Sequence, residues 1–393
     1  MLLEVPGFVG GAIAADLEKK EKKDLAIVFS EVPACAAGVF TTNRVQAAPV
    51  RIDKERIASG RAQAIVANSG NANACTGSRG IEDATAMARA TAKALGIADE
   101  LVLVASTGVI GQPLNLSAME AAIPKLSGQL SRTGLFEVAQ AIMTTDTFPK
   151  AASRKVFVGE RAFSVAAVAK GAGMIRPDMA TMLCFVCTDV SATPQVLDAI
   201  LRKAVAQSFN AITVDGDTST NDTVIVLANG LSGVNLGEAS CAEAFQKTLN
   251  EVLSTLAFQI VRDGEGATKL VRVEVKGAAT DEDARKVAYT IAESPLVKTA
   301  LFGEDANWGR IMAAIGRAGV PVNPETIQIY FDEVRIVKDG QGCGSEAEAD
   351  ATRIFKNDQF SITVDLKLGS NAATVHTCDL STDYVKINAD YRT

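Results

Sequence analysis

The 393-residue sequence contains a single histidine, His376, and this scarcity limits the chemistry that the protein can perform. A Ser-His-Asp or Cys-His triad would have to use that one imidazole, and a histidine-rich zinc site is excluded. No Gly-x-Ser-x-Gly elbow is present to supply a serine nucleophile. His376 lies in a strand-like stretch near the C-terminus, residues 373–378, so we interpret it as a structural residue.

Signals for membranes, secretion and nucleic acid are also missing. No apolar run reaches the roughly 20 residues that span a bilayer, and residues 1–16 have no basic segment before their short apolar run. The net charge of −7 argues against a general affinity for nucleic acid or anionic membranes. The seven cysteines are scattered and odd in number, which argues against a disulfide framework and predicts a cytoplasmic protein.

Two short patterns resemble cofactor motifs but fail on inspection. Cys184 and Cys187 form a Cys-x-x-Cys inside a strand-like run, where residues three apart point to opposite faces and cannot share a metal or a disulfide. Gly171-Ala172-Gly173 has Arg176 where a dinucleotide loop needs its third glycine, and no Walker loop is present. The sequence therefore predicts no bound metal and no resident cofactor.

Strand and helix signals alternate along the whole chain, and 48% of the residues are hydrophobic. A chain of this size can bury a large core and is expected to fold as two lobes. The predicted class is α/β or α+β, with helices packed on sheets. Apolar runs rich in β-branched residues predict strands at residues 25–29, 64–67, 101–105, 182–186, 223–227 and 327–331.

Helix boundaries are predicted from capping signals. Ser117 and Glu120 form a capping box, and Thr193 before Pro194 is an N-cap that opens a helix to about Ala206. Further helices are predicted at residues 243–261, 281–291 and 307–317. Three stretches rich in Gly, Asn, Ser and Thr predict loops at residues 66–80, 216–223 and 303–310. Such loops either supply turns or line a polar ligand site.

The most informative stretch is KGAGMIRPDMATMLCFVCT, residues 170–188. A glycine-rich segment leads to Ala180-Thr181, and an apolar strand follows at once. A threonine hydroxyl needs a base beside it, and cleavage before the threonine would free its own α-amine for that role. An α-amine has a pKa of about 7.7–8.0, which suits general-base catalysis. The alternative is a threonine at a loop-to-strand junction with no catalytic role.

At this stretch the sequence closely resembles the ornithine acetyltransferase (glutamate N-acetyltransferase) family. Other segments resemble that family in the same order along the chain: GVFTTN (38–43), residues 66–80, STGVIG (106–111), VDGDTSTND (214–222), GEDANWGR (303–310) and INADYRT (387–393). The resemblance implies the self-processing fold of that family, whose chemistry is similar to that of N-terminal nucleophile enzymes. It implies cleavage between Ala180 and Thr181, giving an N-terminal fragment, residues 1–180, and a C-terminal fragment, residues 181–393.

The resemblance also implies roles for individual residues. Thr181 is the nucleophile, and Thr107 and Gly108 form the oxyanion hole. The implied substrate-binding residues are Thr144 (with Thr145 as the adjacent alternative), Lys170, Thr181, Glu265, Asn388 and the terminal Thr393. A lysine ammonium can pair with a substrate carboxylate, and a glutamate can meet a substrate amine. Without the resemblance, Thr107-Gly108 reads as a plain turn at a strand end.

The implied reaction is ping-pong transfer of acetyl from N2-acetyl-L-ornithine to L-glutamate through acetyl-Thr181. Acetyl-CoA as a second donor, and hence one or two activities, is left open by the sequence. The family suggests a particle of two copies of each fragment. Two alternatives remain: an N-terminal-nucleophile amidohydrolase or aminopeptidase that passes the acyl group to water, and an amino-acid-binding module without catalysis.

Overall fold

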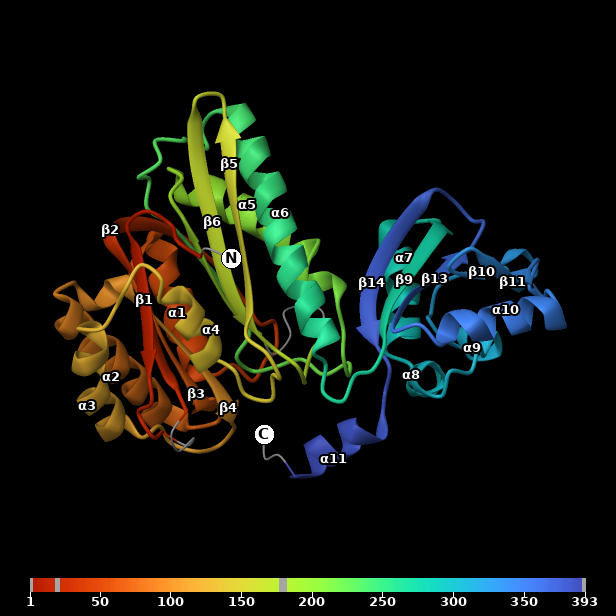
Figure 1. Ribbon diagram of the computed structural model, residues 1–393, viewed down its shortest axis with the longest axis horizontal. Coiled ribbons are helices and arrows are strands. Elements are labelled where there is room, and N and C mark those ends of the chain that lie inside the picture. Colours follow the sequence, from red (N-terminus) through yellow and green to blue (C-terminus); the bar gives the residue numbers. More distant parts are fainter. Residues whose placement is uncertain (1–2, 18–21, 177–181, 391–393) are drawn as a thin grey trace. The chain divides into compact units, whose positions relative to one another are not determined.

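The computed structural model describes residues 3–17, 22–176 and 182–390. It consists of two compact units, the first built from residues within 1–210 and 217–260, the second from residues 211–216 and 261–391 (Figure 1). Each unit has its own sheet with packed helices, which confirms the predicted class and the two lobes. This division does not follow the predicted fragment boundary at 180/181, because residues 182–210 belong to the first unit. Cleavage at that boundary stays a prediction.

The first unit contains one eight-stranded sheet with the order β4-β3-β2-β8-β7-β6-β5, and β1 pairs with β2. Strands β3 and β4 are parallel, as are β7 and β8, and the other neighbours are antiparallel. The strands are β1 (Phe8–Ile13), β2 (Leu25–Phe40), β3 (Arg61–Asn71), β4 (Val102–Val109), β5 (Lys150–Val158), β6 (Arg161–Lys170), β7 (Leu183–Thr188) and β8 (Thr223–Ala228).

This sheet is strongly curled. Five strand spacings separate β4 from β6, which is roughly 24 Å in a flat sheet. Nevertheless Nζ of Lys170, at the end of β6, lies 3.3 Å from Oγ1 of Thr107, near the end of β4. The curl is consistent with β2, whose 16 residues pair with β3 and then with β8, and whose register with β3 shifts between Phe29 and Ala34. Irregularities of this kind bend a strand and increase its twist.

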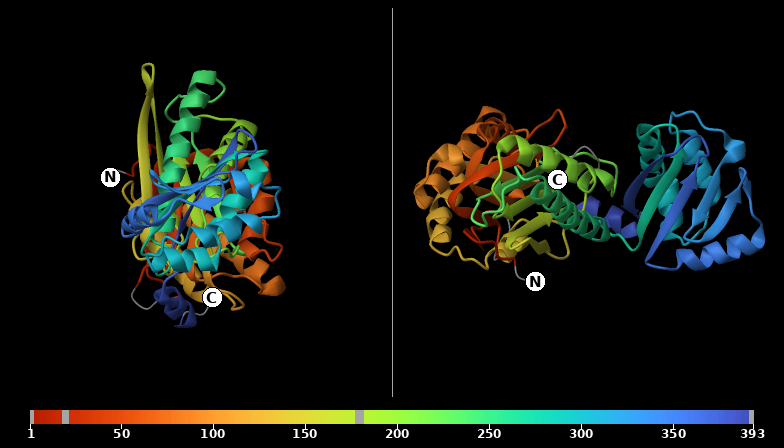
Figure 2. Two further views of the ribbon diagram at one scale, coloured as in Figure 1. Left: turned by 90° about the vertical axis from the view of Figure 1, so that its right-hand side faces the viewer. Right: turned by 90° about the horizontal axis from the view of Figure 1, so that it is seen from above.

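Both faces of the curled sheet are covered. One face packs into a buried cluster shared by strands from both halves of the sheet: Val28, Ile65, Leu103, Val168, Phe185 and Ile225 are among its members. Helices α1 (Ala48–Arg56), α2 (Gly77–Leu95) and α3 (Leu116–Ser127) pack on the opposite face of β2, β3 and β4 (Figures 1 and 2). Helix α6 (Ala239–Arg262) packs on β6, where the rings of Phe163 and Phe245 meet edge to face at 5.8 Å.

Two further helices add to this cover. Helix α4 (Leu135–Ala141) contacts β1, β2, β5 and β6, and helix α5 (Pro194–Ala206) contacts β2. Burial of each large apolar side chain contributes about 1.5–3 kcal/mol. The strand ends that carry the candidate site therefore rest on a well-packed core.

The second unit contains a six-stranded sheet with the order β12-β11-β10-β13-β9-β14, in which only β9 and β13 are parallel among the described strands. Its strands are β9 (Leu270–Ala278), β10 (Gln328–Phe331), β11 (Val334–Lys338), β12 (Gln341–Gly342), β13 (Gln359–Asp365) and β14 (Asn371–Cys378). Its helices are α7 (Asp281–Ala292), α8 (Pro295–Phe302), α9 (Trp308–Gly316), α10 (Ser345–Phe355) and α11 (Thr382–Asp390).

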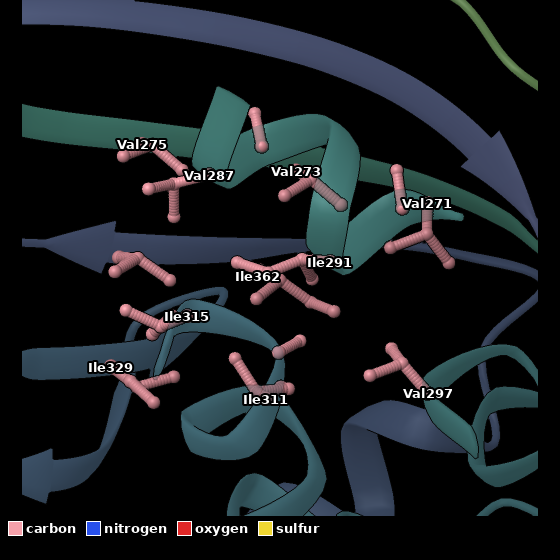
Figure 3. Packing of buried hydrophobic residues seen from close by; sticks show 14 of the residues in the cluster. Val271, Val273, Val275, Val287, Ile291, Val297, Ile311, Ile315, Ile329 and Ile362 are labelled. Carbon is pink, nitrogen blue, oxygen red and sulfur yellow. The ribbon is translucent and has the colours of Figure 1, made fainter. Parts of the chain in front are cut away.

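Alternation along β9 explains how this second core forms. Val271, Val273 and Val275 share one face of the strand and pack towards Val287 and Ile291 of α7, which lie one helical turn apart (Figure 3). The apolar face of a strand, with a period of two residues, thus packs against the apolar face of a helix, with a period of 3.6 residues.

The capping predictions had mixed outcomes. The Thr193 cap is confirmed, because its side chain accepts a hydrogen bond from N–H of Val196 at the start of α5. The predicted Ser117–Glu120 capping box is wrong. Helix α3 begins at Leu116, and the side chain of Asn115 accepts the bond from N–H of Ala118. Asparagine caps a helix as well as serine does, so the residue nearer the true start takes that position.

The predicted strands exist, but several are longer than expected, and the loop predicted at residues 66–80 is mostly wrong. Strand β3 continues to Asn71 and helix α2 begins at Gly77. The strand continues through polar residues because their side chains find partners: Oδ1 of Asn68 accepts from Oγ of Ser106 at 2.6 Å. A buried polar residue with a partner costs little.

Candidate active site

The two predicted oxyanion-hole residues, Thr107 and Gly108, lie near the end of β4. Thr107 is buried, and Gly108 has a φ of +132°. A Cβ at position 108 would lie 2.1 Å from the carbonyl carbon of Gly70 on the neighbouring strand. Only glycine fits this conformation and this close approach. The backbone at the end of β4 is therefore held in a defined position.

Lys170 brings three of the predicted site residues together. Its side chain is buried, and Nζ donates to Oγ1 of Thr107 at 3.3 Å and to Oγ1 of Thr144 at 2.8 Å. Thr144 rather than Thr145 makes this contact. Residues from three separate chain segments thus meet around one ammonium group.

A buried carboxylate that the sequence analysis missed, Asp146, supports this cluster. Its Oδ1 accepts from Nζ of Lys150 and from N–H of Gly171, each at 2.7 Å, and its Oδ2 accepts from N–H of Thr144 at 3.0 Å. Burial alone would raise the pKa of Asp146, but the Lys170 and Lys150 ammonium groups outweigh it and lower the pKa to about 2. Asp146 is therefore ionised at neutral pH and fixes the segments that carry Thr144 and Lys170.

The predicted cleavage site, Ala180 and Thr181, lies outside the described residues. The residue that follows, Met182, is held at both of its backbone polar groups. Its N–H donates to Oδ1 of Asp222 at 2.9 Å, and its carbonyl accepts from N–H of Thr223 at 3.1 Å. Asp222 is fully buried, and this desolvation raises its pKa well above the ordinary value. Nothing in the local sequence marks this residue as part of a site.

In the second unit, the two described residues predicted to bind substrate contact each other. Nδ2 of Asn388, on α11, donates to Oε2 of Glu265 at 2.8 Å. Glu265 is buried, and the neighbouring Gly266 has a φ of +67°. The third predicted residue, Thr393, lies outside the described residues. Their role in substrate binding stays a prediction.

Groups that the sequence analysis interpreted as structural behave as packing residues. Cys184 and Cys187 on β7 are buried, and burial raises the pKa of both thiols. Only Cys187 joins the shared cluster of the curled sheet, as expected for residues three apart on a strand. His376 lies in β14 of the second unit, where burial and the nearby Arg272 lower its pKa. All seven cysteines are free thiols.

Within the described ranges, no group of three or more His, Cys, Asp or Glu side chains is arranged to hold a metal ion. Among the helices that the structure describes, none has the length and apolar character needed to cross a membrane.

Comparison with known proteins now decides the family. A sequence model described as the ArgJ family matches residues 10–393. The chain belongs to the ArgJ family. It is 52% identical over its full length to the full-length arginine biosynthesis bifunctional protein ArgJ of Geobacter sulfurreducens, and 55% identical over both full lengths to that of Syntrophotalea carbinolica.

A solved structure agrees with this assignment. A chain of the arginine biosynthesis bifunctional protein ArgJ from Bacillus halodurans is 45% identical, with a TM-score of 0.50, and the match covers 98% of that chain and 53% of this one. Membership of the ArgJ family confirms the resemblance drawn from the motifs, and with it an acetyltransferase of arginine biosynthesis with glutamate N-acetyltransferase activity.

Proposed function

We propose that the enzyme works by covalent catalysis on Thr181, which is freed by cleavage of the Ala180–Thr181 bond. The proposal rests on one observation: the ammonium group of Lys170 donates hydrogen bonds to Thr107 and Thr144, in the same unit as Met182. Each of these three residues was predicted from the sequence to serve one reaction, and they come from separate chain segments.

The cleavage step needs no outside reagent except water. Oγ of Thr181 attacks the carbonyl carbon of Ala180, the C–N bond breaks, and the amine nitrogen takes the proton that the hydroxyl loses. Water then hydrolyses the resulting ester and leaves a carboxylate on Ala180 and a free amine on Thr181. A half-length relative supports this step: nearly all of the Bacillus halodurans chain matches only 53% of this chain, so that chain is about half as long.

The acetyl transfer uses the same hydroxyl. Thr181 attacks the acetyl carbonyl of N2-acetyl-L-ornithine, with its own α-amine as proton acceptor, and ornithine leaves with that proton. The amine of L-glutamate then attacks the acetyl ester, giving N-acetylglutamate and the free hydroxyl. Thr107 and the N–H of Gly108 stabilise the oxyanion in both halves of the cycle; removal of one such donor typically costs about 10²–10³-fold in turnover.

The substrate contacts follow from the chemistry of the side chains. Lys170 pairs with the α-carboxylate that acetylornithine and glutamate share, and Thr144 orients the Lys170 ammonium through their 2.8 Å hydrogen bond. Glu265, held by Asn388, meets the substrate amine. Thr393 completes the proposed set.

Three finer points belong to the same proposal. The relatives are named bifunctional, which supports acetyl-CoA as a second acetyl donor here. The fragments assemble as two copies of each, and the enzyme works in the cytoplasm without a bound cofactor and without nucleic-acid or membrane partners. An assay that supplies only acetyl-CoA and glutamate tests the second donor.

The alternatives are separated by two measurements. Intact-mass analysis of purified protein is expected to give two chains divided at Ala180–Thr181, whereas a binding module has no reason to cleave. Loss of acetyl from acetylornithine beyond one group per enzyme is expected to require glutamate. Steady release of acetate without glutamate would instead identify an amidohydrolase.

A further inference from the structure

Two neighbouring residues of the loop before β8, Asn221 and Asp222, hold the two backbone segments on which the proposed chemistry depends. Both side chains are buried, Asn221 with 5% and Asp222 with 0% of its surface exposed. Both belong to the polar stretch at residues 216–223, which from its sequence either forms turns or lines a ligand site.

Asn221 reaches the strand end that carries the oxyanion-hole residues. Its Nδ2 donates to the carbonyl of Ser106 at 2.9 Å and to the carbonyl of Ala72 at 2.6 Å, and its Oδ1 accepts from Oγ1 of Thr220 at 2.6 Å. The Ser106 carbonyl belongs to the peptide group whose nitrogen is that of Thr107. Asn221 therefore fixes the orientation of the peptide that leads into the oxyanion hole.

Asp222 reaches the residue that follows the nucleophile. Its Oδ1 accepts from N–H of Met182, and that nitrogen belongs to the peptide group formed by the carbonyl of Thr181. Oδ2 has no hydrogen-bond partner in the described part of the chain. Burial raises the pKa of Asp222, and the Met182 N–H, the Lys170 ammonium group and the hydroxyls of Ser219 and Thr41 lower it only in part. The hydrogen bond from Met182 is the contact through which Asp222 holds this segment.

Turn formation alone does not account for these contacts. Asn and Asp in turns usually bond the backbone about two residues away, whereas Asn221 bonds residues 115 and 149 positions away and Asp222 bonds a residue 40 positions away. Burying a carboxyl group is costly, and an apolar residue could fill the same space without that cost.

We propose that Asn221 and Asp222 act together as positioning residues. Asn221 holds the Ser106–Thr107 peptide, and Asp222 holds the backbone N–H of Met182, the residue after the proposed nucleophile. The idea rests on Thr181 as the proposed nucleophile. Neither residue touches the acetyl group. Each acts through the backbone next to a residue of the proposed reaction, so their loss lowers turnover and leaves substrate affinity nearly unchanged.

Substitutions at position 222 show whether the position of the acceptor oxygen or the presence of an acidic group matters for catalysis. Asp222→Asn keeps an oxygen acceptor at the same distance from Met182, so self-cleavage and kcat are expected to stay within about fivefold of wild type. Asp222→Glu keeps the acid but moves the oxygen by one methylene, and Asp222→Ala removes it. Both are expected to slow cleavage and lower kcat per cleaved chain by roughly 100-fold, because a misplacement of about 1 Å has effects of that size. The KM for acetylornithine is expected to change by less than about threefold.

Asp53 offers a matched control in the same unit. It is also fully buried, its Oδ1 accepts from the backbone N–H of Val104 at 2.9 Å, and its Oδ2 lacks a partner among the described residues. Asp53→Ala removes a similar contact from a similar environment and is expected to lower the melting temperature about as much as Asp222→Ala, with kcat within about threefold of wild type. Asn221→Ala is expected to follow Asp222→Ala in kcat.

The outcomes are decisive in both directions. Normal kcat in Asp222→Ala or Asn221→Ala, an equal loss in Asp53→Ala, or an active Asp222→Glu beside an inactive Asp222→Asn overturns the positioning role. The last result would assign Asp222 a proton-transfer role instead. If an alanine variant fails to fold, the Asn and Glu pair still decides. A Thr181→Ala variant measured in parallel separates failure of the positioning role from failure of the proposed function. Cleavage or acetyl transfer in that variant refutes the proposed function itself.

Discussion

Lys170 and Thr144 are 26 residues apart in the chain, and Nζ of the lysine lies 2.8 Å from Oγ1 of the threonine. The same ammonium contacts Oγ1 of Thr107 and lowers the pKa of buried Asp146. A buried ammonium group at this point can bind a carboxylate without a large rearrangement, since its position is already set by these groups.

Substitution of Lys170 tests this carboxylate-binding role. Lys170→Met is expected to raise the KM for both acetylornithine and glutamate by roughly 10–100-fold, because hydrogen bonds to charged groups contribute about 1.5–3 kcal/mol. The matched control is Lys203→Met, an exposed lysine on α5, which is expected to leave both KM values unchanged. A KM that rises for only one substrate would mean that Lys170 does not bind the α-carboxylate that the two substrates share.

The oxyanion-hole assignment predicts a different kinetic signature. Thr107→Val keeps the shape of the side chain and removes its hydroxyl, so kcat is expected to fall about 10²–10³-fold with little change in KM. Steady-state kinetics on the cleaved enzyme provide the measurement. Gly108→Ala is expected to be at least as damaging, because its Cβ would lie 2.1 Å from the carbonyl carbon of Gly70. A Thr107→Val enzyme with normal kcat would remove that hydroxyl from the mechanism.

The C-terminus gives a third test. If the terminal Thr393 contacts substrate, even a short C-terminal tag is expected to raise KM, while the same tag at the N-terminus has no effect. Kinetics of the two tagged proteins, with the tag then removed by protease, make the comparison. Equal KM values for both would exclude Thr393 from the site.

Because Asp53 is a buried acid, the stability of the folded protein is expected to depend on pH. Burial raises its pKa well above the ordinary value, and the Val104 N–H and Arg56 offset this only in part. The unfolded chain, with a pKa of about 3.9, releases the proton at lower pH than the folded chain does. Stability from this group is therefore fully present below about pH 4 and is lost as pH rises towards the folded pKa.

Asp53→Asn keeps the acceptor for Val104 and removes this titration. The melting temperature of the variant is expected to rise relative to wild type as pH increases from 4 to 7. Asp198→Asn on α5, whose side chain pairs with Arg202 at the surface, is the control and is expected to show no such trend. A constant difference between Asp53→Asn and wild type over this range would contradict the raised pKa.

The sequence predicted the parts of the fold that depend on local signals. The Thr193-Pro194 cap and the apolar stripe of α6 follow from hydrogen bonding and periodicity within a few residues, and both are confirmed. The length of β2 was missed, because Glu31 and Pro33 interrupt its apolar pattern at the place where its register with β3 shifts. The curl of the sheet depends on that shift and on packing between distant strands, neither of which a local pattern contains.

In the candidate site, too, residues marked by local sequence were predicted, and residues whose role depends on distant contacts were not. Thr107, Gly108, Thr144 and Lys170 were found through motifs, and the structure brings them together. Asp146 and Asp222 were missed, since nothing in their local sequence distinguishes a buried acid from one in a solvated turn. Their importance appears only when burial and contacts 40 residues away are known. Glycine at 108 could be explained only once the approach of Gly70 was visible.

The most direct test of the central claim is intact-mass analysis of the purified enzyme mixed with acetylornithine in the absence of glutamate. The account predicts two chains, of which the one that begins at Thr181 gains the mass of one acetyl group, while the other is unchanged. Addition of glutamate should then remove that mass and yield N-acetylglutamate. An uncleaved active enzyme, or an acetyl group attached to any residue other than Thr181, would contradict it.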